Sequence, residues 1–199
     1  MLHIICALKH EARPLVEHFQ LIHDGGSKEF ITYGNQVSGL SLTVTGTGLD
    51  AAAHGTAFVI AYHNAGVNDA WLNIGIAGHA SLPVGTPVLV TRVLSQDDNR
   101  TWMPVINFPH DLDTSDLLTV SQTVSEYARG RMYDMEAAGF FQEASASGTP
   151  DRVHCLKIIS DNRDHPAENV SAVMVRQLIT QNLRAIEFVI NKLKQIIQL

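Results

Sequence analysis

The chain is poor in charge and in long apolar runs. Charged residues make up 17% of its 199 residues, below the usual share of about 25%. No cluster of Lys or Arg stands out, and the formal net charge is −6. Nucleic-acid binding by bulk charge is therefore disfavoured. No apolar stretch approaches the roughly 18 residues of a membrane span, and the first residues lack the basic segment of a signal peptide. We expect a cytoplasmic protein that binds neither membrane nor nucleic acid.

Cysteine and the common catalytic motifs are also scarce. The two cysteines, Cys6 and Cys155, both fall in strand-like runs, which is typical of small apolar core residues in a reducing compartment. The ten histidines are scattered, and neither the zinc pattern H-E-x-x-H nor a P-loop nor a G-x-S-x-G elbow occurs. The sequence therefore predicts no metal and no cofactor.

Apolar runs that predict strands alternate with helical stretches. The predicted strands span residues 2–8, 30–33, 41–45, 70–74, 87–94, 117–121 and 153–159. The predicted helices span residues 13–19, 49–62, 135–147 and about 170–197. Pro14 fits the first turn of the first helix, where no intrahelical N–H is needed, and residues 75–78 read as a turn. Because a Gly- or Pro-rich linker and internal repeats are missing, the pattern predicts one α/β domain over residues 1–199.

Three carboxylates stand at element ends, where ligands of α/β folds usually bind. Glu11 follows the first strand, Glu136 opens a helix, and Asp161 follows the strand at 153–159. Each also has a structural interpretation. Glu11 and Glu136 would complement helix N-termini, worth a few tenths to about 1 kcal/mol each, and Asp161 would cap the loop at 162–166. Taken singly, each carboxylate is better explained by its structural interpretation.

Two glycine turns add to the case for a ligand. Gly46-Thr47-Gly48 joins a strand to a helix, where glycine allows a ligand to approach the backbone. With Ala51 it also matches a relaxed dinucleotide fingerprint, but the acid that should close the following strand is missing, since Asp69 precedes a strand. Tight turns for packing would explain either glycine pair alone.

Four segments, in order, resemble the purine/uridine phosphorylase family, most closely its methylthioadenosine/S-adenosylhomocysteine nucleosidase branch. They are residues 5–11 (ICALKHE), 45–48 (TGTG), 73–78 (NIGIAG) followed by Val84-Gly85, and 134–137 (DMEA) followed by 159–161 (ISD). The resemblance spans nearly the whole chain. It implies a single domain with a central mixed twisted β-sheet flanked by helices, a small nucleoside as the binding partner, no cofactor, and a homodimer.

The resemblance also implies a chemistry and a set of roles. The family cleaves the N-glycosidic bond of nucleosides. Asp161 matches the acid that protonates the departing base, and Glu11 matches the base that activates water. The substrate contacts implied are Glu136 at the ribose hydroxyls, Met135 against the sugar, and Gly75, Ile76, Ala77 and Ser160 around the sugar and base.

The chain departs from the family pattern in three places. Ile76 stands where many members carry a Ser, and Lys157 stands where the nucleosidases have an Arg. The stretch between Leu94 and Met135 is shorter than in typical members, so residues 121–124 are expected to complete the base pocket. The phosphorylases place an Arg and a Ser where this chain has Asn73 and Ile76, which predicts that phosphate is not a substrate.

Four functions fit these residues in order of preference. The first is hydrolysis of a purine-type ribonucleoside, 5′-modified or not, with release of the free base. The second is phosphorolysis by the same fold. The third is a nucleoside-binding protein without turnover, which the residues at 76 and 157 favour and the three carboxylates oppose. A dinucleotide-dependent dehydrogenase is the last.

Overall fold

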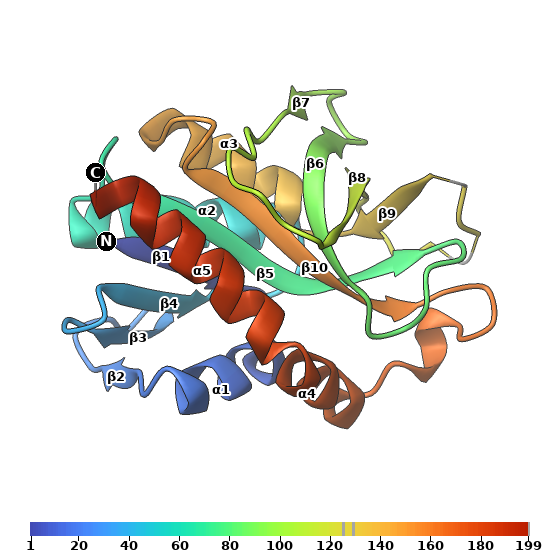
Figure 1. The fold of residues 1–199 in the computed structure, drawn as a ribbon, viewed down its shortest axis with the longest axis horizontal. Coiled ribbons are helices and arrows are strands. Elements are labelled where there is room, and N and C mark those ends of the chain that lie inside the picture. Colours follow the sequence, from blue (N-terminus) through green and yellow to red (C-terminus); the bar gives the residue numbers. More distant parts are fainter. Residues whose placement is uncertain (125, 129, 199) are drawn as a thin grey trace.

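The computed structural model describes residues 1–124, 126–128 and 130–198 (Figure 1). Its strands are β1 (Leu2–Cys6), β2 (Ile22–Asp24), β3 (Ile31–Asn35), β4 (Leu40–Val44), β5 (Ala70–His79), β6 (Pro87–Ser95), β7 (Thr101–Trp102), β8 (Asp113–Thr119), β9 (Arg131–Asp134) and β10 (Val153–Asp161). Its helices are α1 (Lys9–His18), α2 (Leu49–His63), α3 (Ala137–Ser147), the short 3-10 helix η1 (Ala167–Asn169), α4 (Ala172–Gln181) and α5 (Leu183–Gln198).

The strands form one mixed sheet in the order β10-β6-β8-β9-β5-β1-β4-β3-β2, with β7 attached to β6. Because β10 also pairs with β5, the strands β5, β10, β6, β8 and β9 close into a ring. The central strands β4, β1, β5 and β10 run parallel to one another. Their carboxyl ends therefore meet at one edge of the sheet, which is where ligands of α/β folds bind.

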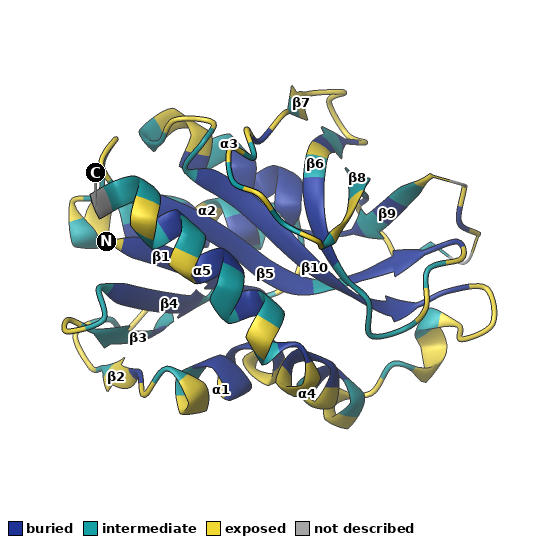
Figure 2. Ribbon diagram, in the orientation of Figure 1, coloured by how far each residue is buried: buried dark blue, intermediate teal, exposed yellow. Residues whose placement is uncertain are grey.

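Helices cover both faces of the sheet, and Figure 2 shows that the central strands between them are buried. One core cluster joins α1, α4 and α5 to residues of β1 and β5 such as Ile4 and Leu72. The other joins α2 and α3 to the opposite face through residues such as Ile5 and Trp71. Neighbouring residues of one strand thus point to opposite cores, as the period of two requires. The α/β architecture expected from the sequence is confirmed.

Cys6 and Cys155 are both buried, and neither forms a disulfide. Each belongs to one of the two cores, as expected for small apolar residues. Within the residues described, none of the helices is long and apolar enough to cross a membrane.

The first helix begins four residues earlier than predicted, at Lys9 rather than residue 13. Its N-terminus is stabilised by Glu11, whose carboxylate accepts hydrogen bonds from the N–H groups of Ala7 and Leu8. An acidic side chain in the first turn that reaches back to these donors stabilises a helix start. Pro14 consequently lies inside α1 and not in its first turn.

The turn predicted at residues 75–78 is wrong, because β5 continues without a break to His79. Both neighbours of β5 come from distant parts of the chain: Gly75 pairs with Lys157 of β10, and Gly78 pairs with Tyr133 of β9. A Cβ atom at Gly78 would lie 2.5 Å from the Asp161 Oδ2. The glycines of this segment therefore serve close packing across the sheet.

The long C-terminal helix predicted at about 170–197 is two helices. The break falls at Asn182, whose side-chain amide donates hydrogen bonds to the carbonyl oxygens of Leu178 and Gly85. This amide ends α4 and attaches it to the loop before β6. Strand β9 was not predicted at all, and α3 begins at Ala137, two residues later than expected.

Candidate active site

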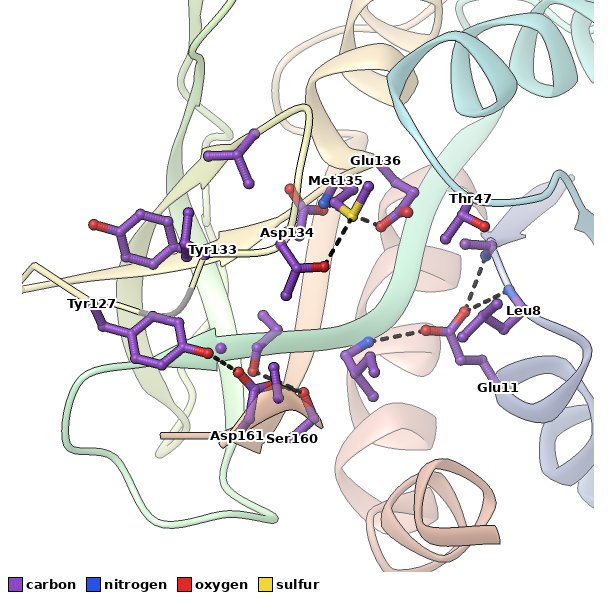
Figure 3. A pocket seen from close by; sticks show the side chains of 18 residues that line it. Leu8, Glu11, Thr47, Tyr127, Tyr133, Asp134, Met135, Glu136, Ser160 and Asp161 are labelled. Atoms are coloured by element: carbon purple, nitrogen blue, oxygen red, sulfur yellow. Dashed lines mark hydrogen bonds between the residues drawn. The ribbon is translucent and has the colours of Figure 1, made fainter. Parts of the chain in front are cut away.

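A cavity of about 140 Å³ opens at the carboxyl ends of β1, β5 and β10 (Figure 3). Glu11, which is 125 residues from Glu136 in the sequence, lines it together with Glu136 and Asp161. Figure 3 shows Asp161 and Tyr127 on one side of the cavity, Leu8 and Glu11 on the other, and Met135 and Glu136 between them. The structure thus brings together the three carboxylates that the sequence singled out.

Glu11 is almost completely buried, with 2% of its surface exposed. Its Oε2 accepts hydrogen bonds from the N–H groups of Ala7 and Leu8, at 3.1 and 2.8 Å. Its Oε1 accepts one from the Ile76 N–H, at 3.1 Å. Burial raises the pKa of Glu11 to about 7, although Lys157 and these hydrogen bonds oppose the shift. A carboxyl group with this pKa is suited to act as a base near neutral pH.

Glu136 is held by the glycine turn between β4 and α2. Its Oε1 accepts a hydrogen bond from the Gly48 N–H, at 3.0 Å, and burial followed by the charge of Asp134 raises its pKa. Glu136 is the N-cap residue of α3, but its side chain makes no capping hydrogen bond there. Asp134 has this role, because its carboxylate accepts a hydrogen bond from the Ala137 N–H, at 2.8 Å.

Asp161 is the last residue of β10, and hydroxyl groups approach both of its oxygens. Ser160 donates a hydrogen bond to Oδ1, and Tyr127 donates one to Oδ2. Asp161 does not cap the loop that follows it. Asn162 does, since its side-chain oxygen accepts hydrogen bonds from the N–H groups of Asp164 and His165. The carboxyl group of Asp161 therefore faces the cavity.

Met135, Ile76, Ala77 and Ser160 line the cavity, as the resemblance implied, but Gly75 does not. It lies beneath Glu11, and a Cβ atom added there would stand 2.9 Å from the Glu11 Oε1. Of the segment at 121–124, Thr123 and Val124 reach the cavity. Two of the four residues of this segment therefore line the cavity, and their role toward the base stays a prediction.

Several lining residues carry no signal in the sequence that marks them as part of a site. Tyr127 and Tyr133 pack against each other with ring centroids 5.6 Å apart, and Thr47 contributes from the glycine turn. Tyr127 lies in a connection without apolar periodicity, so no local pattern marks it. Asp134 precedes Met135 directly and could have been found as a further acid next to the motif.

The described lining contains four carboxylates and neither Lys nor Arg. Lys157 is buried and forms an ion pair with Asp134, with the Nζ and Oδ2 atoms 2.9 Å apart. Arg13 points away on the surface of α1, where it pairs with Glu17. Such a cavity attracts positive charge and repels anions. In the part of the chain that the structure describes, no group of three or more His, Cys, Asp or Glu side chains is placed to hold a metal ion.

Comparison with known proteins gives matches at the level of structure. No family model matches the sequence, and no curated protein matches it either. A variant of the Helicobacter pylori methylthioadenosine nucleosidase, solved with 5′-methylthioadenosine in its active site, superposes with a TM-score of 0.78 over 96% of this chain and 98% of that one, at 12% identity. The fold is that of the nucleosidases.

Two further nucleosidase-fold structures support this assignment. The futalosine hydrolase of Helicobacter pylori strain 26695 has a TM-score of 0.77 and 11% identity, with 96% and 97% of the two chains covered. The Arabidopsis thaliana 5′-methylthioadenosine nucleosidase has a TM-score of 0.71 and 18% identity, with 98% and 95% covered. The fold expected from the resemblance is thus confirmed over nearly the full length of the chain.

Proposed function

We propose that the protein hydrolyses the N-glycosidic bond of a purine-type ribonucleoside, with or without a 5′ modification, and releases the free base. The observation that carries this proposal is the cavity itself, in which three separated carboxyl groups surround a space lined by neither Lys nor Arg among the described residues. The likeness of the fold to nucleosidases and to a futalosine hydrolase supports the same reaction.

The reaction divides between the two sides of the cavity. As the bond between the anomeric carbon and the base nitrogen breaks, the sugar gains positive charge and the base gains negative charge. Asp161 delivers a proton to the base, and Glu11 takes a proton from the water that attacks the anomeric carbon. The surrounding carboxylates stabilise the positive charge that develops on the sugar. The products are the free base and the free sugar.

Water rather than phosphate is the proposed nucleophile. A phosphate dianion needs cationic or hydroxyl donors, and the Ile76 side chain offers none. Burying phosphate oxygens against it would cost several kcal/mol. Lys157 and Arg13, which would be the alternative cations, do not line the cavity.

The test is chromatography of the products from a panel of purine nucleosides, first in phosphate-free buffer and then with phosphate added. We expect release of base and free sugar in both buffers, at similar rates. A strict requirement for phosphate, with ribose 1-phosphate as product, would identify a phosphorylase. Stabilisation in a thermal-shift assay without base release would identify a binding protein.

A second prediction concerns Glu136 and the sugar. Charge-assisted hydrogen bonds to ribose hydroxyls are worth about 1.5–3 kcal/mol, so a 2′-deoxynucleoside should be cleaved roughly 10-fold or more slowly than its ribonucleoside. This preference should shrink in Glu136→Gln and persist in the control Glu143→Gln, which changes an acid within α3, the helix that directly follows Glu136. Equal rates for the two sugars in the unaltered protein would remove Glu136 from ribose recognition.

We further propose a cytoplasmic homodimer. The segment 95–116 exposes the apolar side chains of Met103 and Val105. Exposed apolar side chains next to each other often mark protein interfaces, and the two free cysteines suit a reducing compartment. Light scattering should give the mass of two chains, and the mass of one chain would contradict the dimer.

A further inference from the structure

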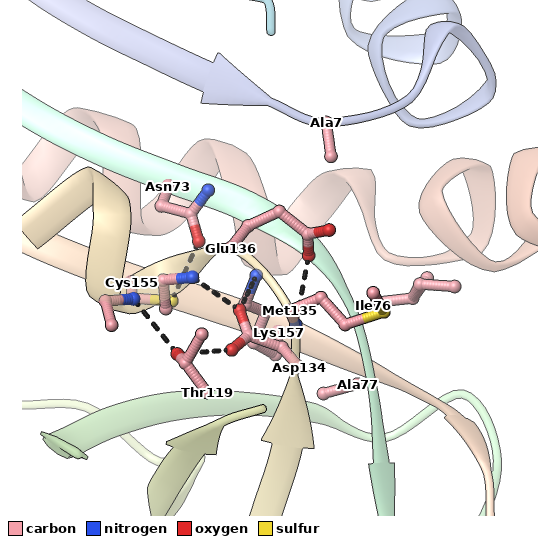
Figure 4. Close-up of polar contacts among 12 residues, drawn as sticks. Ala7, Asn73, Ile76, Ala77, Thr119, Asp134, Met135, Glu136, Cys155 and Lys157 are labelled. Carbon is pink, nitrogen blue, oxygen red and sulfur yellow. Dashed lines mark hydrogen bonds and ion pairs between the residues drawn. The ribbon is translucent and has the colours of Figure 1, made fainter. Parts of the chain in front are cut away.

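Lys157 lies directly behind the cavity, and the proposed mechanism does not use it. It is 1% exposed and belongs to β10, in register with Gly75 of β5 (Figure 4). The Asp134 carboxylate that pairs with Lys157 is itself fixed by the Thr119 hydroxyl, which donates a hydrogen bond at 2.7 Å, and by the Ala137 N–H. The position of the ammonium group is therefore set by three elements of the fold.

Gly75 separates this ammonium group from Glu11. A Cβ atom on Gly75 would lie 2.9 Å from the Glu11 Oε1 and 3.3 Å from the Lys157 Nζ. The two charged atoms consequently approach within about 6 Å of each other, a range in which opposite charges interact strongly inside a protein. Only glycine leaves the space between them open.

We infer that Lys157 is a positioning residue for Glu11: held by Asp134, it supplies across Gly75 the positive charge that keeps the buried Glu11 carboxylate able to accept a proton. That Glu11 acts as the base rests on the proposed function. The charge coupling between the two side chains does not, and it can be measured in the absence of any substrate.

The surrounding charges agree with this arrangement. Besides Lys157, the titratable groups that interact with Glu11 are Glu136 at the start of α3 and the Cys6 thiol of β1, and Asp134 at the end of β9 acts on Lys157. None of these three carries positive charge. Lys9 and His10 of its own helix are exposed. On the solvent side of α1, Arg176 of α4 pairs with Glu17. Lys157 is thus the buried positive charge of this group.

The pKa values point in the same direction. Lys157 is the largest influence that opposes the effect of burial on the Glu11 pKa. Burial lowers the pKa of Lys157, but Asp134 and the other nearby acids raise it by more, so that it stays above its usual value. The lysine therefore remains charged at neutral pH.

NMR titration of the Leu8 and Ile76 amides tests the coupling directly, since both N–H groups donate hydrogen bonds to Glu11. The midpoint of this titration reports the protonation of Glu11, and we expect Lys157→Met to raise it by one pH unit or more. Asp134→Asn, which removes a competing negative charge and keeps the shape, should lower it. Gly75→Ala should raise the midpoint by pushing the two charges apart. The control Lys9→Met removes an exposed lysine two residues from Glu11 and should leave the midpoint unchanged.

The inference would be overturned if the titration midpoint were the same in the unaltered protein, Lys157→Met and Asp134→Asn. It would also be overturned if Lys157→Met shifted the midpoint no further than Lys9→Met does. If Lys157→Met does not fold, Asp134→Asn decides. If the nucleosidase function holds, the rising limb of the pH–rate profile should move with the NMR midpoint. Shifted midpoints in a protein that hydrolyses no nucleoside would contradict the proposed function and leave the coupling intact.

Discussion

Asp161→Asn is expected to slow base release by about 10²-fold or more, the usual range for loss of a general acid. The amide has nearly the same shape as the carboxyl group and can still form hydrogen bonds with the Ser160 and Tyr127 hydroxyls. It cannot deliver a proton to the departing base. Nucleoside binding should therefore be kept, so that kcat falls while the dissociation constant stays close to that of the unaltered protein.

Two variants serve as controls for this result. Asp164→Asn changes an exposed carboxylate in the loop that follows β10 and should leave the rate unchanged. Ser160→Ala removes one of the hydroxyl donors to Asp161 and should have a smaller effect than Asp161→Asn. Unchanged turnover of a 6-aminopurine nucleoside by Asp161→Asn would remove Asp161 from the mechanism.

Glu11→Gln is expected to lower base release by about 10²- to 10⁴-fold, because the amide cannot accept a proton from water. In the unaltered protein the rate should rise with pH through about 7, the pKa to which burial raises Glu11. The residual activity of the variant should lack this rising limb. Glu17→Gln, which alters an exposed acid of the same helix, is the matched control. If the rate of Glu11→Gln still rises with pH through about 7, the group that titrates in this range is not Glu11.

The same pair of proteins should differ in the pH dependence of their stability. Folding raises the pKa of Glu11 from 4.5 to about 7, so the folded state binds the proton more tightly than the unfolded state. The contribution of Glu11 is most favourable below pH 4.5 and is lost as the pH rises through 7. Relative to the unaltered protein, the free energy of unfolding of Glu11→Gln should therefore improve by about 3 kcal/mol over this range, as measured by denaturant titration at several pH values.

Local patterns predicted much of the fold because they depend on few neighbours. The buried central strands read as continuous apolar runs, and α2 was predicted to within one residue of its observed end at His63. The turn predicted from the glycines at residues 46–48 is also present: Gly46 and Gly48 both adopt positive φ angles, which other residues rarely take. The order of the motifs pointed to Glu11, Glu136 and Asp161 before their positions in space were known.

Long-range pairing decided the rest. Residues 75–78 look like a turn in isolation but form a strand because β9 and β10 supply partners on both sides. The C-terminal apolar spacing is continuous, yet Asn182 ends α4 through a carbonyl group that lies 97 residues away. Strand β9 has four residues, too few for a periodic signal, and is held in place by β8 and β5.

The sequence by itself determined the residue types, their order and hence the class of fold and the candidate carboxylates. Only the tertiary structure decided what surrounds each of them. In the folded chain the Tyr127 hydroxyl donates a hydrogen bond to Asp161, and the Gly48 N–H donates one to Glu136. Gly75, which was expected to line the cavity, lies between Glu11 and Lys157 instead. The pKa of a carboxyl group depends on burial and on charges within a few ångströms. Those neighbours come from distant segments, so no local pattern can report them.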